Sequence, residues 1–199
     1  MDQETSRKDD YVRILDFLPK GKMDMPSHKR KPIAQSIGEK YFSLLELIPR
    51  RDVNFEVGER VYIGENTREK VDHIERRIKY EWLTPMSKSE LVHVLEKIIK
   101  DNDKEYLEFY NTVGTITTRQ HKLELLPRVG KRHRQDILNE RETEKFKSFE
   151  DMQNRVKNLP DPAKIIADRI ILELKGEEKY ALFVPVRDRE LKQAFGGRI

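Results

Sequence analysis

The chain has 199 residues, with 40 lysines and arginines, 36 aspartates and glutamates, and no cysteine. The lack of cysteine excludes disulfide frameworks, thiolate metal sites and cysteine nucleophiles, and it favours a reducing, cytoplasmic environment. This length predicts one domain or two small ones, because domains typically contain about 100–150 residues. The net charge of +4 permits a polyanionic partner, but only the distribution of the charge can point to one.

The two ends of the sequence differ in character. Residues 1–10 are polar and charged, and we expect a disordered N-terminus rather than a signal peptide. Residues 177–199 are expected to form a C-terminal strand, over 179–186, followed by a tail. No run of the sequence approaches the roughly 18 apolar residues of a membrane span, so no membrane partner is expected.

Residues 11–85 are predicted to form a small β-barrel. Strands are expected over 11–18, 41–48 and 60–63, where β-formers or alternating apolar residues are followed by turn residues. Residues 71–80 fit either a strand or a short helix. Closure into a barrel would remove the exposed sheet edges of so small a domain.

Residues 86–176 are predicted to be all-α. The pattern Ser87-Lys88-Ser89-Glu90 fits a capping box, and the apolar residues that follow at helical spacing predict a helix to about Lys100. The further predicted helices span 105–111, 117–126, 131–144, 149–158 and 162–174.

The segment 123–138 carries the strongest signal for function. A helix stops at Pro127, and a tight turn through Val129 and Gly130 leads into a second helix. Gly130 lets the backbone approach a ligand closely, and the first N–H groups of the second helix have no partner within that helix. A turn of this kind is suited to binding a phosphate.

Positive charge is concentrated around this turn. Between residues 119 and 134, six lysines and arginines stand against one acidic residue, so the local net charge of +5 exceeds the +4 of the whole chain. Such a cluster attracts the phosphate backbone of a nucleic acid. The predicted nucleic-acid-binding residues of the segment are Arg119, Lys122, Arg128, Val129, Gly130, Lys131, Arg132 and Arg134.

The segment resembles the helix-hairpin-helix motif, whose usual form is Leu-Pro-Gly-Val/Ile-Gly followed by a helix. Leu126-Pro127 and Val129-Gly130 are in register with that form, whereas Arg128 stands where the motif has its first glycine. The resemblance implies binding to the backbone of DNA or RNA through turn amides and nearby cations. The competing interpretation is a purely structural turn between packed helices.

A second helix, Leu-Pro turn and helix follow over 149–174. This copy has no glycine in its turn and carries Asp161 there, so it should repel a phosphate. We interpret it as structural, packing against the first copy. Pro162 is expected to start its second helix.

A basic loop is predicted over residues 20–31. Its glycine, proline and serine content is typical of a loop, and five cations against Asp24 give it a net charge of +4. Small barrels use such loops to bind single-stranded nucleic acid. The competing interpretation is a solvated linker. The predicted nucleic-acid-binding residues of the loop are Lys20, Lys22, Lys29, Arg30 and Lys31.

Aromatic rings of the barrel half are available to stack on bases. The sequence does not show which of them face solvent, and most are expected to be buried. The rings are Tyr11, Tyr41, Phe42, Tyr62, Tyr80 and Trp82.

Catalysis finds little support in the sequence. The five histidines lack metal-ligand spacing, and neither a nucleophile elbow nor a glycine-rich phosphate loop is present. Asp101-Asn102-Asp103 resembles the opening of a calcium loop, but Tyr106 stands where that loop needs glycine, so a helix stop is preferred. We predict no catalytic residue, no metal and no cofactor.

Taken together, three segments resemble an uncharacterised archaeal family of predicted RNA-binding proteins: residues 55–64, 119–127 and 146–151. The resemblance extends from about Tyr11 to the end of the chain. It implies an α+β fold, in which a small OB-like or S1-like β-barrel is followed by a helix-hairpin-helix region. It also implies a role near RNA metabolism, with ribosomal RNA as one candidate.

We therefore expect a non-catalytic, cytoplasmic nucleic-acid-binding protein that prefers RNA to DNA and is monomeric by default. One alternative is a DNA-binding or DNA-repair accessory module. Another is a protein–protein interaction module in which the hairpin is only structural. A nucleic-acid-processing enzyme would need a specific carboxylate that the sequence does not nominate.

Overall fold

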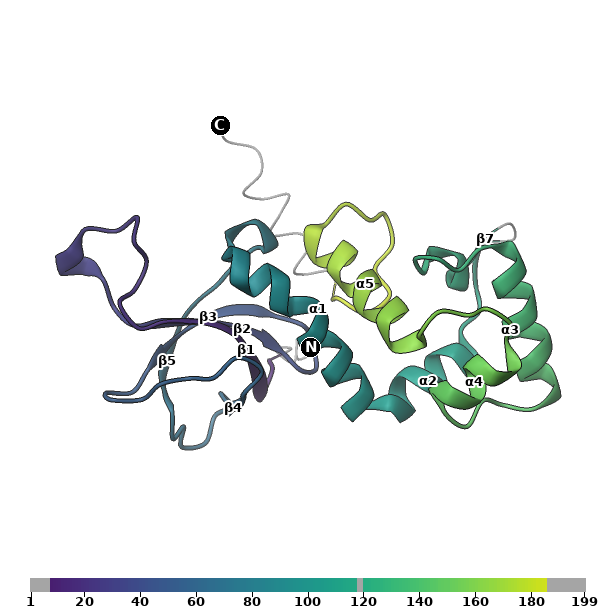
Figure 1. The fold of residues 1–199 in the computed structure, drawn as a ribbon, viewed down its shortest axis with the longest axis horizontal. Helices are drawn as coiled ribbons and strands as arrows, with labels where there is room; N and C mark the ends of the chain where they lie inside the picture. The colour runs from purple at the N-terminus through teal and green to yellow at the C-terminus, as the bar shows by residue number, and fades with distance from the viewer. Residues whose placement is uncertain (1–7, 118–119, 186–199) are drawn as a thin grey trace, which may run out of the picture. The chain divides into compact units, whose positions relative to one another are not determined.

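The computed structural model describes residues 8–117 and 120–185 (Figure 1). The strands are β1 (Tyr11–Leu18), β2 (Ile33–Gly38), β3 (Leu44–Pro49), β4 (Arg60–Tyr62), β5 (Val71–Arg77), β6 (Thr115–Thr117) and β7 (Gln120–His121). The α-helices are α1 (Pro85–Asp101), α2 (Asp103–Thr112), α3 (Lys131–Thr143), α4 (Phe149–Arg155) and α5 (Pro162–Lys175). Three 3-10 helices complete the set: η1 (Ser27–Lys29), η2 (Tyr80–Trp82) and η3 (Lys122–Leu125). The fold is therefore α+β, as predicted.

The described chain divides into two compact units. The first contains the residues up to Val94 and those from Leu174 onward, and the second contains Leu95–Glu173. Helices α1 and α5 therefore each contribute residues to both units.

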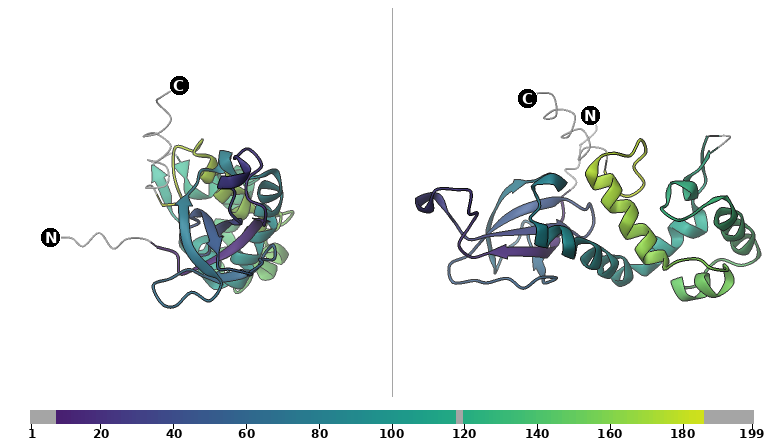
Figure 2. Two further views of the ribbon diagram at one scale, coloured as in Figure 1. Left: turned by 90° about the vertical axis from the view of Figure 1, so that its left-hand side faces the viewer. Right: turned by 45° about the horizontal axis from the view of Figure 1, so that its top comes forward.

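The first unit is built on a five-stranded antiparallel sheet of order β4-β1-β2-β3-β5. The sheet curls into a half-barrel rather than the predicted closed barrel (Figure 2). Strand β4 has only three residues, because Gly58, with φ of 79°, and the bend at Gly64 bracket it. So short a strand pairs with β1 alone, and no ladder joins it to β5 in the described residues.

A cluster of buried apolar residues packs against one face of the sheet. Alternation along β1 and β3 brings Val12 and Ile14 to the same cluster as Leu45 and Leu47, all of them buried. The remaining buried members are Ala34, Phe55, Val61, Ile63 and Val71. The strands predicted over 11–18, 41–48 and 60–63 are confirmed with shifted ends, and the ambiguous segment 71–80 contains a strand. Strand β2 was not predicted.

Helix α1 begins earlier than predicted, at Pro85. The backbone N–H of Ser87 donates to the hydroxyl of Thr84 over 3.0 Å, so Thr84 rather than Ser87 caps the helix. Ser87 is buried, and its hydroxyl donates instead to Oε1 of Gln35 on β2 over 2.8 Å. The predicted capping box is therefore wrong, because the fold uses Ser87 to bind the helix to the sheet.

The second unit confirms the predicted helices over 105–111, 131–144, 149–158 and 162–174, with small shifts at their ends. The helix predicted over 117–126 is wrong. Thr115–Thr117 forms strand β6, as the β-branched run favours, and β7 and η3 follow. Leu126 has ψ of 132° because the residue before a proline is excluded from the helical region. The segment before Pro127 therefore cannot continue as a helix into the turn.

Two predictions at the ends of the chain also need correction. Residues 179–185 form bends and irregular backbone rather than the predicted strand, and residue 186 lies outside the described residues. Val184 is the only buried residue of that run, and Pro185 cannot donate a ladder hydrogen bond. At the other end, Asp9 is buried and accepts the N–H groups of Lys40 and Tyr41 over 2.9 and 2.8 Å, so ordered chain precedes residue 11.

Candidate functional site

The turn between η3 and α3 is anchored by two buried apolar side chains. Leu126 and Val129 are 2% and 4% exposed, and the N–H of Val129 donates to the carbonyl of Leu126 over 3.2 Å. Both residues point their side chains into the unit, so the turn presents backbone and flanking cations to solvent. Val129, predicted as a binding residue, can therefore contribute only its backbone.

Arg128 occupies a backbone conformation that favours glycine. Its φ of 64° lies in the left-handed region, where a Cβ atom is disfavoured. The turn thus keeps a geometry suited to the glycine of the motif, although arginine stands there. The carbonyl of Arg128 lies 3.2 Å from Nδ1 of His133 on α3, and its guanidinium pairs with Asp168 on α5. The guanidinium of Arg128 is therefore already engaged within the fold and is not a free cation for a phosphate.

Gly130 is open to solvent. Its φ of −84° and ψ of −179° are extended, so the backbone there does not require glycine. A Cβ atom at Gly130 would have no atom within 4 Å. Gly130 is the N-cap of α3 but has no side chain to bond the first N–H groups of that helix. A ligand that approaches the turn can therefore reach these donors.

The cations near the turn fall into two groups. Arg134 pairs with Glu124, and Arg128 pairs with Asp168, so these two are neutralised within the fold. Lys131 is exposed, and the Arg132 side chain is 81% exposed, with Asp136 3.9 Å away. Lys122 is partly buried without a partner among the described residues, and Arg119 lies outside them. Lys131 and Arg132 are thus the cations best placed to contact a phosphate.

Helix α5 supports the turn from within the unit. Arg169 is 1% exposed, its Nη1 donates to the carbonyl of Leu125 over 2.8 Å, and its Nε pairs with Glu173 over 2.9 Å. Together with the Arg128–Asp168 pair, these contacts join the turn after η3 to helix α5. Asp168 and Arg169 could not be predicted as supporting residues, because each lies about 40 residues from its partner at or before the turn.

His121 caps η3 in its neutral form. Burial, followed by the charges of Arg141 and Arg134, lowers the pKa of His121 below 6.5. The ring Nδ1 can then accept the N–H of Leu123, which lies 3.1 Å away. His121 is therefore a structural element of the segment that precedes the turn.

Two cations of the predicted basic loop, Lys22 and Arg30, are bound within the fold. Nζ of Lys22 pairs with the buried carboxylate of Glu46 over 2.5 Å. Arg30 donates to the carbonyls of Met23 and Met25 within the loop. Lys20, Lys29 and Lys31 are exposed and have no partner among the described residues. Of the five cations predicted to bind nucleic acid, these three are unneutralised.

Two rings of the barrel half stand out by exposure. Tyr11 is 37% exposed and Trp82 is 49% exposed, whereas Phe42 is buried. The Tyr11 ring is already covered by the Arg60 guanidinium, 3.5 Å from its centroid, and by the edge of Tyr62. Trp82 is therefore the more accessible platform.

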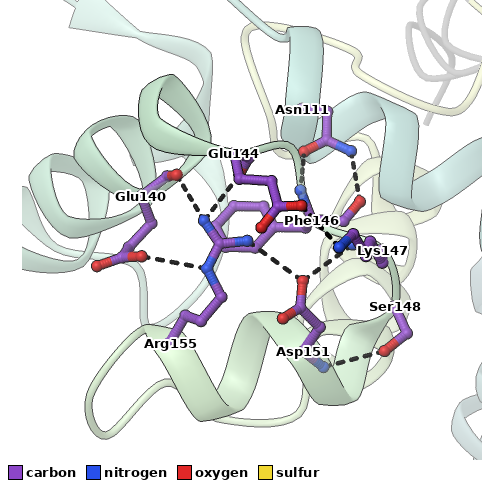
Figure 3. Close-up of polar contacts among 8 residues, drawn as sticks. All are labelled: Asn111, Glu140, Glu144, Phe146, Lys147, Ser148, Asp151 and Arg155. Atoms are coloured by element: carbon purple, nitrogen blue, oxygen red, sulfur yellow. Dashed lines mark hydrogen bonds and ion pairs between the residues drawn. The ribbon is translucent and has the colours of Figure 1, made fainter.

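A second charged cluster surrounds Arg155, near the C-terminal end of α3 (Figure 3). The guanidinium of Arg155 donates to the Glu140 carboxylate over 3.1 Å and to that of Asp151 over 3.2 Å, and it also binds the carbonyls of Glu140 and Glu144. The ring of Phe146 packs on it, 4.6 Å from centroid to Cζ. The cluster joins α3 to α4, and its two carboxylates are engaged in that role.

The described ranges offer neither a metal site nor a membrane span. Residues 8–117 and 120–185 contain no group of three or more His, Asp or Glu side chains that could hold a metal ion. Within the same ranges, every helix is too short or too polar to cross a lipid bilayer.

Comparison with known proteins places the chain in a family. Residues 8–185 match the family described as "Protein of unknown function (DUF655)". The chain belongs to this family. The expected assignment to an uncharacterised family is thereby confirmed, while RNA binding is not part of the family description.

Two similar proteins come from archaea, as expected from the sequence. The chain is 46% identical over 178 residues to "Uncharacterized protein MJ0038" of Methanocaldococcus jannaschii, which covers 88% of this chain and 80% of that protein. It is also similar to the crystal structure of Af1531 from Archaeoglobus fulgidus, with 47% identity and a TM-score of 0.85 over 89% of this chain and all of the other. The DUF655 fold described above is therefore shared with an experimental structure.

Proposed function

We propose that this DUF655 protein is a non-catalytic nucleic-acid-binding protein that grips the phosphate backbone with the Gly130 turn. The observation that supports the proposal most is the combination of an open glycine, uncapped helix N–H groups and two exposed cations, Lys131 and Arg132. A helix N-terminus favours a negatively charged group, and adjacent cations add counterion release.

In the first unit, Lys20, Lys29 and Lys31 of the basic loop supply a separate set of exposed cations for a phosphate backbone. RNA is favoured over DNA by the family resemblance rather than by the chemistry of the site, which would bind any polyanion. Structured RNA such as a ribosomal RNA fragment, single-stranded RNA and duplex DNA are therefore the three probes to compare. In this proposal the resemblance to the helix-hairpin-helix motif is limited to the turn and α3. The described residues just before the turn form β7 and η3 rather than the first helix of the motif.

Replacing both Lys131 and Arg132 with glutamate tests the proposal. Filter binding across a salt series should give a linear log–log plot for the native protein. If each cation contacts one phosphate, the slope should become less steep by about 1.8 on duplex DNA and about 1.4 on a single strand. The affinity of the double variant at low salt should also be lower than that of the native protein.

The matched control reverses two exposed lysines of the same unit, Lys104 and Lys157, and so produces the same net charge. The control should keep the native slope. Equal effects of the two double variants would show only a general charge effect, and an unchanged slope in the Lys131 and Arg132 variant would overturn the turn assignment.

Gly130→Ala separates binding from stability. Because Gly130 is extended and a Cβ atom there meets nothing, the free energy of unfolding should change by less than about 1 kcal/mol. A methyl group on the surface of the turn should nevertheless weaken nucleic-acid binding by obstructing a close phosphate. Gly114→Ala is the control, since Gly114 has equally open space but lies outside the turn. Unaltered affinity in Gly130→Ala would argue against close backbone approach.

A further inference from the structure

The outer side of the half-barrel carries a hollow between the basic loop and strands β3 and β5. Its volume is about 250 Å³. Apolar side chains of Ile33, Ile48 and Met25 line it. Four cations and two acids line it as well: Lys22, Lys29, Lys31, Arg76, Glu46 and Glu75. Lys22 and Arg76 pair with Glu46, which leaves Lys29 and Lys31 as the cations with no partner among the described residues. Apolar side chains beside unpaired cations are complementary to a nucleotide, which joins a flat base to a phosphate.

Trp82 lies beside this hollow, because Arg76 is close to both. The Arg76 guanidinium lines the hollow and also lies 5.2 Å from the centroid of the Trp82 ring. Nζ of Lys79 lies 6.0 Å from the same centroid. Both distances are at the outer range of cation–π contacts, so these cations flank the indole without packing tightly on it.

The backbone that carries the indole is fixed. The carbonyl of Trp82 accepts Nε2 of Gln35 over 3.0 Å, and Gln35 is fully buried. The next residue, Leu83, is 4% exposed and anchors the end of η2. A half-exposed indole on a fixed backbone offers a rigid stacking surface, which loses little entropy when a base packs on it.

We infer that Trp82 is a stacking platform for an unpaired base, and that the hollow beside it, with Lys29 and Lys31, holds the neighbouring phosphates of a single-stranded nucleic acid. Bases of a duplex are already stacked and do not fit this platform. The inference rests on the proposed function and adds to it the strandedness of the ligand and a second contact area, in the first unit.

Trp82 is the only tryptophan of the chain, which allows a direct test. Fluorescence excited at about 295 nm should be quenched in a saturable manner by an oligouridylate or oligothymidylate. A blunt duplex should bind without comparable quenching. The concentration at half-quenching should match the Kd from filter binding of the same oligonucleotide.

Trp82→Ala should weaken single-strand binding roughly 5- to 150-fold, the equivalent of 1–3 kcal/mol per stacked base. Trp82→Phe should restore much of the affinity, because a phenyl ring still stacks. Tyr11→Ala is the control ring and should leave affinity unchanged, with thermal melting used to verify that each variant is folded.

The two proposals fail in different ways. Native protein that binds single strands without quenching, or a Trp82→Ala variant that binds them like the native protein, would overturn the platform while leaving the turn untouched. Native protein that binds no nucleic acid in filter assays would overturn both.

Discussion

Replacing Arg169 with methionine should lower the free energy of unfolding by about 3–5 kcal/mol, the usual cost of removing one partner from a buried ion pair. Methionine keeps much of the aliphatic volume, so the effect reports the loss of the charge and of the guanidinium's hydrogen bonds. Glu173, which is 1% exposed, would lose its guanidinium partner, and the carbonyl of Leu125 would lose its donor. Urea unfolding followed by circular dichroism measures the change.

A double variant provides the control. Arg169→Met combined with Glu173→Leu replaces both charges by apolar groups, and such replacements are often close to neutral. Most of the lost stability should return. If the single variant costs less than about 1 kcal/mol, the pair does not stabilise this unit in the way its burial suggests.

Loss of Arg169 should also disturb the turn before the unit unfolds. The Leu125 carbonyl lies at the end of η3, just before Leu126 and Pro127 fix the path into the turn. Amide hydrogen exchange at Val129 and the first residues of α3 should therefore accelerate in the variant more than exchange in α2. Equal acceleration throughout the unit would indicate a global effect only.

Glu46→Gln should lower the free energy of unfolding at neutral pH by about 2–3 kcal/mol, because charge-assisted hydrogen bonds are lost at a buried site. The Glu46 side chain is 1% exposed and accepts Lys22 over 2.5 Å, Arg76 over 2.7 Å and Gln35 over 3.3 Å. Glutamine keeps the shape but removes the negative charge. Lys22 and Arg76 are more exposed than Glu46, so the expected loss of stability is at the low end for a buried ion pair.

The direction of the Glu46 pKa shift determines how the stability of the protein depends on pH. Burial raises the pKa of Glu46, but hydrogen bonds from Lys22, Arg76 and Gln35 together outweigh it, and the pKa lies below 4.5. The stability that the carboxylate supplies is therefore fully present above pH 4.5 and is lost as the pH falls through the folded pKa.

The native protein and Glu46→Gln should consequently converge in stability as the pH falls below 4.5. Chemical unfolding at a series of pH values measures this convergence. Lys22→Met is the matched control, and it should cost less, because the Lys22 side chain is 21% exposed. A difference between native protein and Glu46→Gln that stays constant down to pH 3 would show that the carboxylate is not the group responsible.

The helices were predictable where apolar residues repeat without interruption. Leu91, Leu95 and Ile98 recur on one face of α1 and are all buried, so the period alone identified the helix. Strand β2 had no such pattern, because all six of its residues are buried, Gln35 and Ser36 included. A central strand with buried polar residues shows no alternation of apolar and polar side chains. Its polar groups are instead satisfied by partners distant in the sequence.

The predicted helix over 117–126 shows how local signals compete. Residues 122–126 include good helix formers, but Pro127 removes the last of them from the helical region, and the preceding threonines favour a strand. Only four residues remain helical, as η3. The same proline and Gly130 nevertheless marked the turn itself correctly.

The candidate site was predictable as a concentration of charge but not as a set of available cations. Arg128 and Arg134 carry the same charge in the sequence as Lys131 and Arg132, yet their partners Asp168 and Glu124 neutralise them in the fold. Likewise, no local pattern distinguishes the exposed Trp82 from the buried Phe42. Which charges and rings reach solvent depends on tertiary contacts.

The open half-barrel has a consequence for how the molecule meets copies of itself. Strands β4 and β5 end the sheet and leave backbone groups that a neighbouring chain could pair with. Strand β4 is too short to serve as a template, and β5 carries Asp72, His73, Glu75, Arg76 and Arg77 within seven residues. An added strand would have to desolvate this row of charges. The charges on β5 therefore disfavour self-association through this sheet edge.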